Sequence, residues 1–362
     1  MTVNDVPTPA LIIDATAVRR NLARMADYSR RHSLAIRPHT KTHKSRKLAA
    51  MQLAAGCRGL TVAKVGEAEV LAGDCDDLLI AYPALDPART ARIAKLAATK
   101  TIHVGVDSRE CVEAIAAAAR GAGSTVGILV DLDVGMGRTG VQSPEAAWSL
   151  AELVLKTQGV RLDGLMCYPG QIWGSGAEQR TNLQAVAARL EAVLSIWKQH
   201  GVPAPIVSGG STPTAFQSHC VPQFTEIRPG TYIFNDVNTF RAEYCTVDDC
   251  AARFTCTVVS NAVPGQVVID AGSKTLTSDR CFPAPDSGHG YLVEYPNAVI
   301  TKLTEEHGQV DIRNCDRAPK LGERVSVIPN HICPCVNLQD TAWWSDEGRL
   351  EPLTIDARGK LS

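Results

Sequence analysis

Short apolar segments alternate with longer helical patterns through the first two thirds of this 362-residue chain, and this alternation limits the possible folds more than any other feature. Short runs rich in Val, Ile and Leu predict buried strands, whereas apolar residues at three- and four-residue intervals, as in Pro144–Lys156 and Glu178–His200, predict amphipathic helices. The predicted strands are Leu34–Arg37, Gly59–Ala63, Asp77–Tyr82, Thr101–Val106, Val126–Asp131, Leu162–Tyr168, Pro205–Ser208 and Glu226–Ile233.

Eight strand–helix units are the number found in a TIM barrel, so we predict an α/β fold, a (β/α)8 barrel over residues 16–240. An open doubly wound sheet is the alternative. After Asp236 the chain becomes rich in Val, Ile, Thr and turn residues, which predicts a second, mainly β domain. We assign residues 1–15 and 241–362 to it, because the strand-like run Thr8–Asp14 lies outside the eight and is expected to pair with the C-terminal sheet. Its other predicted strands are Thr255–Val263, Gln266–Ile269, Tyr291–Tyr295 and Arg324–Ile328.

Charge and hydropathy exclude several classes of function. The formal net charge is −1, aromatic residues make up only 5% of the chain and no basic stripe is present, so a nucleic-acid partner is not expected. No apolar run approaches the roughly 20 residues that cross a bilayer, and Met1–Asp5 lacks the basic start of a signal peptide. The twelve cysteines are scattered, unlike a disulfide framework. We therefore expect a cytoplasmic protein with no membrane partner.

The segment Arg37–Lys44 places two lysines and two histidines after the first predicted barrel strand. Barrel enzymes carry their chemistry at the carboxyl ends of the strands. Burial beside other cations disfavours the ammonium form, so Lys41 or Lys44 there could condense with an aldehyde as a Schiff base, with His39 as a neighbour. A solvated basic loop is the alternative.

Two glycine-containing segments follow the last two predicted barrel strands, where TIM barrels often hold phosphate groups. In both segments backbone N–H and hydroxyl groups can converge on an anion, although turns also use Gly and Ser for purely conformational reasons. The candidate phosphate ligands are Ser208, Gly210, Ser211, Thr212, Gly230, Thr231 and Tyr232, with Arg228 as a nearby cation.

Two further motifs carry polar chemistry. Arg138, in a glycine-rich loop after the fifth strand, can donate to a ring nitrogen or a carboxylate, or can pair with Asp131 or Asp133. His331 and Cys333 lie two apart on a predicted extended segment, so their side chains should point to the same face. A thiolate and an imidazole favour zinc over magnesium or manganese, although a buried pair without a metal is the alternative.

Taken together, these motifs resemble those of the D-threonine aldolase and D-serine dehydratase family. Members of this family are alanine-racemase-like (fold-type III) pyridoxal-phosphate enzymes. The resemblance runs over nearly the whole chain, through Thr8–Ala10, Arg37–Lys41, Gly135–Gly140, Tyr168, Gly210–Pro213, Arg228–Tyr232, Asp270–Gly272, Glu306–Gly308 and Pro329–Cys333.

This resemblance implies roles for particular residues. Lys41 would hold pyridoxal phosphate as a Schiff base, Arg138 would face the pyridine nitrogen, and Tyr168 would lie by the cofactor. The phosphate would lie among the residues of the two glycine-containing segments. His331 and Cys333 would bind a divalent metal, with zinc favoured and manganese or magnesium possible. Lys41, His39 and Tyr168 are the candidate catalytic residues.

The reaction expected from the resemblance is retro-aldol cleavage of D-threonine-like substrates to glycine and an aldehyde. Cys333 and the Ala81–Pro83 segment instead resemble the zinc-dependent dehydratases, which form a 2-oxo acid and ammonia from D-serine or D-3-hydroxyaspartate. A metal-free racemase and a non-catalytic pyridoxal-phosphate carrier are further alternatives, and the metal pair counts against both. The resemblance also implies a small-molecule D-amino acid substrate and a homodimer.

Overall fold

The computed structural model describes residues 1–174 and 176–362, which group by their contacts into two compact units. The barrel unit comprises residues 25–41, 46–230 and 360–362, and the β-rich unit comprises residues 1–24, 42–45 and 231–359. Both units therefore combine segments that are far apart in the sequence. The domain boundaries at residues 16 and 240 stay a prediction.

The barrel unit contains a parallel sheet that closes on itself. The order of its strands is β2-β9-β8-β7-β6-β5-β4-β3, and a parallel bridge between His39 and Thr61 joins the two ends. This closure confirms the predicted α/β barrel and excludes the open sheet. The strands are β2 Ala35–Ile36, β3 Leu60–Val62, β4 Asp77–Ile80, β5 Thr101–Val106, β6 Val126–Leu132, β7 Val160–Cys167, β8 Ile206–Gly209 and β9 Glu226–Ile227.

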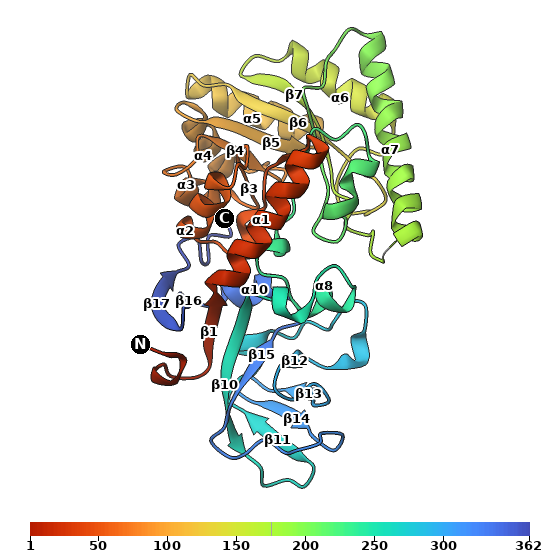
Figure 1. The fold of residues 1–362 in the computed structure, drawn as a ribbon. Helices are drawn as coiled ribbons and strands as arrows, with labels where there is room; N and C mark the ends of the chain where they lie inside the picture. The colour runs from red at the N-terminus through yellow and green to blue at the C-terminus, as the bar shows by residue number, and fades with distance from the viewer. Residues whose placement is uncertain (175) are drawn as a thin grey trace. The chain divides into compact units, whose positions relative to one another are not determined.

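Helices cover the outside of these strands (Figure 1). Their N-termini are stabilised by side chains, because Asp86, Ser108 and Ser143 each accept a hydrogen bond from a backbone N–H of the first turn. None of the helices in the described residues is both long and apolar enough to span a membrane. The helices of the barrel unit are α2 Arg46–Ala54, α3 Val65–Leu71, α4 Pro87–Ala97, α5 Arg109–Gly121, α6 Pro144–Lys156 and α7 Gly176–Gln199, and the boundary between the two units falls within α1 Ala15–His32.

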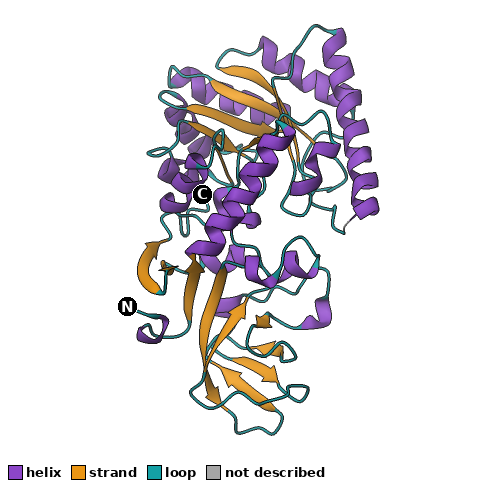
Figure 2. Ribbon diagram, viewed as in Figure 1, coloured by secondary structure: helices purple, strands orange, loops and turns teal. Residues whose placement is uncertain are grey.

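The β-rich unit is built on a mixed sheet in the order β13-β14-β11-β10-β1-β16-β17, in which β15 also pairs with β10 and β12 pairs with β15 (Figure 2). The N-terminal strand β1 lies between antiparallel β10 and parallel β16, which confirms that Thr8–Asp14 contributes to this sheet. The strands are β1 Ala10–Asp14, β10 Ala252–Ser260, β11 Gln266–Ile269, β12 Tyr291–Leu292, β13 Val299–Leu303, β14 Gly308–Asp311, β15 Arg324–Ile328, β16 Thr341–Asp346 and β17 Arg349–Thr354. Three short helices accompany them, α8 Val237–Arg241, α9 Ser273–Leu276 and α10 Ile332–Asn337.

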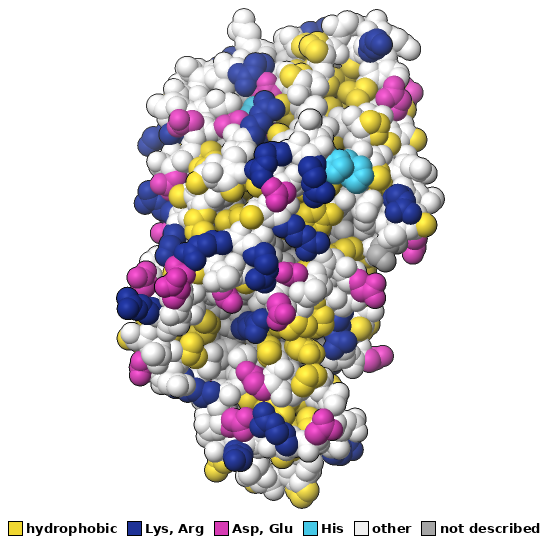
Figure 3. Space-filling model, in the orientation of Figure 1, with side chains coloured by type: hydrophobic (Ala, Val, Ile, Leu, Met, Phe, Trp, Pro, Cys, Tyr) yellow, Lys and Arg dark blue, Asp and Glu magenta, His cyan; other side chains and the backbone are white. Residues whose placement is uncertain are grey.

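Acidic and basic side chains are mixed on the face shown in Figure 3, without a large field of one sign. This distribution agrees with the formal net charge of −1. The face shown in Figure 3 therefore gives no electrostatic support for binding a polyanion.

Candidate active site

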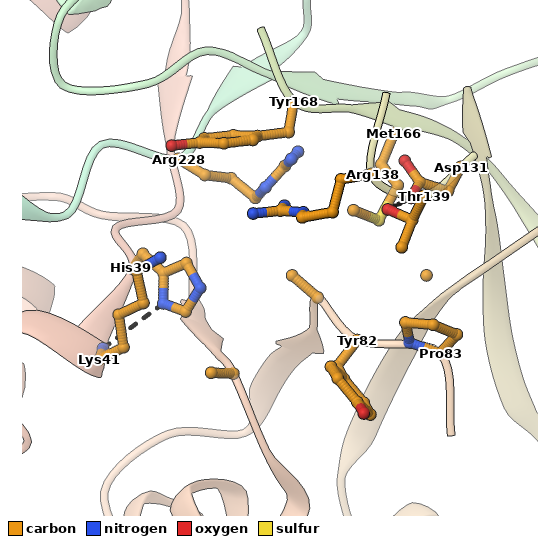
Figure 4. Close-up of a pocket in the computed structure, with 13 residues that line it drawn as sticks. His39, Lys41, Tyr82, Pro83, Asp131, Arg138, Thr139, Met166, Tyr168 and Arg228 are labelled. Atoms are coloured by element: carbon orange, nitrogen blue, oxygen red, sulfur yellow. Dashed lines mark hydrogen bonds between the residues drawn. The ribbon is translucent and has the colours of Figure 1, made fainter. Parts of the chain in front are cut away.

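The barrel unit encloses a cavity of about 310 Å³ at the carboxyl ends of its strands. Several predicted site residues line it, but they come from different strands: His39 and Lys41 follow β2, Arg138 follows β6 and Tyr168 follows β7. Figure 4 shows His39 and Lys41 across the cavity from Asp131 and Thr139, with Arg138 and Arg228 next to the ring of Tyr168. The fold thus brings together reactive and charged residues that are far apart in the sequence.

Lys41 and Lys44 have different surroundings. Lys41 lies in the 3-10 turn Thr40–Thr42, and its backbone N–H donates to Nδ1 of His39 at 3.4 Å while its side chain lines the cavity (Figure 4). Lys44 is 4% exposed and donates from Nζ to the carbonyl of Ala357 at 3.3 Å in the β-rich unit. Of the two candidate lysines, only Lys41 therefore lines this cavity.

The guanidinium of Arg138 lies over the ring of Tyr168, with its central carbon 4.8 Å from the ring centre. Asp131 accepts a hydrogen bond of 2.8 Å from the hydroxyl of Thr139, and Asp133 accepts from N–H groups of its own loop. In the described residues neither carboxylate forms an ion pair with Arg138, so the structural pairing considered above is absent. Arg138 is thus directed to the cavity and to the aromatic face.

Burial raises the pKa of the Asp131 carboxyl, and the hydrogen bond from Thr139 only partly offsets this effect. Asp133 behaves in the opposite way. Burial acts to raise its pKa, but hydrogen bonds from the N–H groups of Gly137 and Gly135 outweigh burial and lower it. Asp131 is therefore the carboxyl group of this cavity that holds a proton most readily, whereas Asp133 is a charged cap of the loop.

Ser208 lies deeper than the sequence suggests. Its side chain is fully buried, donates to Oε1 of Glu226 at 2.7 Å and accepts from Nη1 of Arg228 at 2.7 Å. Its predicted role as a cofactor ligand stays a prediction. Sequence reasoning missed Glu226, because nothing in the residues around a carboxylate at the start of a short strand indicates that it is buried. The cavity position of Arg228, in contrast, follows from its place after the last barrel strand.

The two predicted phosphate segments meet in the barrel unit, since the N–H of Gly230 donates to the hydroxyl of Thr212 at 3.2 Å. Gly210 has a φ of +72°, and a Cβ atom at this position would lie 3.0 Å from the side chain of Ile227, so the turn requires glycine. Ser211 binds Thr214 within the same loop. Thr231 and Tyr232 belong to the β-rich unit, where Tyr232 is buried and the Thr231 hydroxyl lies 3.7 Å from Sγ of Cys333.

The proposed metal pair also lies in the β-rich unit, although its geometry differs from the expected extended segment. His331 caps α10 and Cys333 lies in the first turn of that helix, where Sγ donates to the Thr42 hydroxyl at 3.1 Å. Burial opposes the charged imidazolium of His331, but Cys333 and Asp279, the latter 3.4 Å away, outweigh burial and raise the pKa of His331 to about 11. Among the described residues, no group of three or more His, Cys, Asp or Glu side chains is arranged to hold a metal.

Comparison with protein families identifies two regions of the chain. Residues 13–237 match the model described as alanine racemase, N-terminal domain, and residues 251–344 match the putative serine dehydratase domain. The first match alone covers more than half of the chain.

Individual relatives match over nearly their full length. A D-threonine aldolase of Arthrobacter sp is 31% identical over 98% of this chain and 93% of its own, and a D-threo-3-hydroxyaspartate dehydratase of Delftia sp. (strain HT23) is 32% identical over 90% of both. The crystal structure of D-threonine aldolase from Filomicrobium marinum superimposes with a TM-score of 0.91 at 29% identity, covering 100% of this chain and 98% of the aldolase. The Delftia dehydratase superimposes with a TM-score of 0.88 at 28% identity, covering 98% of each chain. It has also been solved as a His-to-Ala variant and, in the metal-free form, as a Cys-to-Ala variant two positions further along.

Proposed function

This chain belongs to the D-threonine aldolase and D-serine dehydratase family, and from that membership we propose that it is a pyridoxal-phosphate- and metal-dependent lyase that cleaves D-threonine-like 3-hydroxy amino acids to glycine and an aldehyde. The observation that carries the proposal is the position of Lys41 in the barrel cavity, which it shares with Arg138, Tyr168 and Arg228. An amine among guanidinium groups suits an aldehyde cofactor and an amino acid carboxylate.

The residues around the cavity fit pyridoxal phosphate. Lys41 supplies the amine that can bind its aldehyde, and the glycine turn at Gly210 lets the backbone approach a bound group closely. Ser211, Thr212 and Gly230 supply hydroxyl and N–H groups at the contact between the two loops, which suits a phosphate. When bound, the cofactor supplies an electron sink for the substrate's Cα.

The side chains of the cavity would do the remaining work. The Lys41 amine would be placed to accept or donate a proton at the substrate's Cα. Arg138 can bind the substrate carboxylate while its flat guanidinium stays on the Tyr168 ring. His39, whose Nδ1 accepts from the Lys41 N–H, holds the backbone turn that carries the lysine.

We assign metal binding to His331 and Cys333, for which the ligand types favour zinc. A bound divalent ion would act as a Lewis acid on the substrate's 3-hydroxyl group. Two protein ligands leave positions open for water and substrate. The identical His-x-Cys spacing in the variants of the Delftia dehydratase, one of them metal-free, supports this assignment.

That same spacing supports a second candidate reaction, β-elimination of water from a D-3-hydroxy amino acid to give a 2-oxo acid and ammonia. The aldolase is placed first because the Arthrobacter and Filomicrobium aldolases cover 98% and 100% of this chain, against 90% and 98% for the Delftia dehydratase in the same two comparisons, although the identities are nearly equal. Both reactions would use the same lysine and the same metal pair, so the products must decide between them.

Product analysis tests the proposal directly. The purified protein, loaded with pyridoxal phosphate and zinc, is incubated separately with D-threonine, D-serine and D-3-hydroxyaspartate, with the L-enantiomers as matched controls. We expect glycine and acetaldehyde from D-threonine and no product from L-threonine. A 2-oxo acid with stoichiometric ammonia would establish the dehydratase instead, and turnover of none of the three would favour a non-catalytic carrier.

A further inference from the structure

Arg228 is a buried cation whose direct partners are neutral. It is 5% exposed and lines the cavity, yet its guanidinium donates to the Ser208 hydroxyl and to the Cys167 carbonyl, both at 2.7 Å. In the described part of the chain no carboxylate pairs with it directly. A buried guanidinium is costly unless an anion is close. Two buried carboxylates act on the charge of Arg228 through space, Glu226 more strongly than Asp131, and Glu226 is also connected to it by hydrogen bonds through Ser208.

Ser208 leads to such an anion. Its hydroxyl donates to Oε1 of Glu226 at 2.7 Å, and Glu226 is fully buried. Nε of Arg37 donates to Glu226 at 2.9 Å, and the other end of the Arg37 guanidinium binds the Asp77 carboxylate. The side chains of Arg37 and Glu226 are 1% and 0% exposed, so this ion pair is closed to water.

The chain of charges continues from Asp77 to the amino-terminal side of the barrel. His103 lies 3.1 Å from Asp77 through Nε2 and 2.6 Å from Asp163 through Nδ1, and Arg161, half exposed, binds Asp163. Two glycines leave room for these side chains. A Cβ atom on Gly127 would lie 1.8 Å from Oδ2 of Asp163, and one on Gly59 would lie 2.6 Å from Nη1 of Arg37.

We propose that Ser208 and Glu226 are positioning residues, which hold the Arg228 guanidinium in a fixed orientation at the cofactor cavity. Glu226 is itself held in place by the series of ion pairs Arg37–Asp77–His103–Asp163. This inference deepens the proposed function and rests on it, because it assigns the cavity cation and the residues that fix its direction. Arg228 then presents its remaining N–H donors to the cofactor or to the substrate carboxylate.

The physical basis is the sharing of one hydroxyl between two charges. The Ser208 proton points to the Glu226 carboxylate, so the oxygen lone pairs face Nη1 of Arg228. Each bond polarises the other, because the donor ability of a hydroxyl rises when its oxygen accepts from a cation and its acceptor ability rises when its proton binds an anion. Removal of the hydroxyl breaks both bonds and frees the guanidinium to turn.

Ser208→Ala tests the inference against a matched control, Ser218→Ala. Ser218 is an equally buried serine of the barrel unit, but its hydroxyl donates to the Thr214 carbonyl and does not contact Arg228. The measurements are the dissociation constant of pyridoxal phosphate from the metal-free apoprotein and the absorption maximum of the bound cofactor. We expect Ser208→Ala to weaken binding by about tenfold to a hundredfold and to shift the maximum, since hydrogen bonds to charged groups are lost. Ser218→Ala should change the constant by less than about threefold.

Two variants separate positioning from folding. Ser208→Thr keeps the hydroxyl and should restore most of the cofactor affinity, and Glu226→Gln keeps the shape of the acceptor without its charge and should lie between the parent and Ser208→Ala. Unchanged cofactor affinity and absorption in Ser208→Ala, or equal losses in the Ser208 and Ser218 variants at matched thermal stability, would overturn the inference. The titration contains no amino acid, so its outcome is independent of the reaction that the enzyme catalyses.

Discussion

At the scale of the residue, the role of a side chain depends more on the direction in which it points than on its position in the sequence. Lys41 and Lys44 belong to the same basic octapeptide, but Lys41 lines the cavity and Lys44 binds the Ala357 carbonyl. Sequence reasoning alone leaves both as candidates, because a non-periodic loop carries no information on which side chain points inward. The family resemblance selects Lys41, and its position in the cavity supports that choice.

The first prediction concerns this pair. We expect Lys41→Ala to lose the visible absorption band of the covalently bound cofactor and to reduce activity by at least about a thousandfold, because covalent attachment and proton transfer both depend on this amine. Lys44→Ala should keep the band. Absorption spectra of both variants after gel filtration check the prediction, and a parent-like band in Lys41→Ala would contradict it.

A second prediction compares two cysteines of α10. Cys333 lies beside His331, whereas the Cys335 thiol donates to the backbone carbonyls of Leu276 and His331. Cys333→Ala should lose bound zinc, since a single imidazole holds the ion weakly, and Cys335→Ala should retain it. Metal content by plasma mass spectrometry, with circular dichroism to verify folding, decides the matter. Full zinc occupancy in Cys333→Ala would remove this residue from the ligand set.

At the scale of the element, periodicity predicts the long helices and the buried strands well. Predicted helix Pro144–Lys156 matches α6, and the predicted strands Thr101–Val106 and Gln266–Ile269 match β5 and β11. The last barrel strand is much shorter than the predicted Glu226–Ile233, because Pro229 and Gly230 end it and a 3-10 helix follows. Strands β13, β14, β16 and β17 were not predicted, since short, partly exposed strands with polar and charged residues lack a clear apolar run.

The third prediction concerns strand β6, where Gly127 faces Asp163 and His103. A methyl group at this position would lie 1.8 Å from Oδ2 of Asp163 and 2.9 Å from Nδ1 of His103, so these side chains would have to move. We expect Gly127→Ala to lower the free energy of unfolding by about 2–4 kcal/mol. At Gly121, in α5, a Cβ atom meets nothing within 4 Å, so Gly121→Ala should raise stability by about 0.5–1 kcal/mol. Urea unfolding of both variants is the measurement, and equal midpoints would refute the steric argument.

At the scale of the whole molecule, the charges within the barrel predict how global stability depends on pH. Burial acts against the charged form of His103, but its ion pairs with Asp163 and Asp77 outweigh burial and raise its pKa. The stability contributed by charged His103 is therefore fully present below its unfolded pKa of about 6.5 and is lost as the pH rises through the folded value. Burial likewise opposes ionisation of Asp77 and Asp163, but His103, Arg37 and Arg161 lower their pKa values.

The fourth prediction follows from these signs. The two carboxylates contribute stability above about pH 4 and lose it as the pH falls through their folded pKa values, so this cluster is most stabilising between about pH 4 and 6.5. His103→Gln should remove the decline on the alkaline side. His200→Gln, at an exposed position, should leave it unchanged. Urea midpoints between pH 5 and 9 test this, and an identical slope in His103→Gln and the parent would be inconsistent with it.

The overall architecture could be predicted because each strand and each helix leaves its own periodic pattern of apolar residues in the sequence. The candidate site was predicted in part: Lys41, Arg138 and Tyr168 do line one cavity. Glu226 and the connection through Ser208 to Arg228 could not be predicted, because they depend on which side chains face the inside of the barrel when it closes. The segment at His331 was predicted to be extended, but it is the start of α10. His331 is the N-cap of this helix and Cys333 lies in its first turn.

The position of β1 between β10 and β16 has a consequence for synthesis. A ribosome makes Ala10–Asp14 more than 200 residues before it makes either partner strand, Ala252–Ser260 or Thr341–Asp346. At usual elongation rates this strand waits on the order of ten to sixty seconds for its neighbours. During that time its apolar side chains and unpaired backbone groups are exposed on the nascent chain, so chaperone binding to this strand during translation should raise the yield of folded protein.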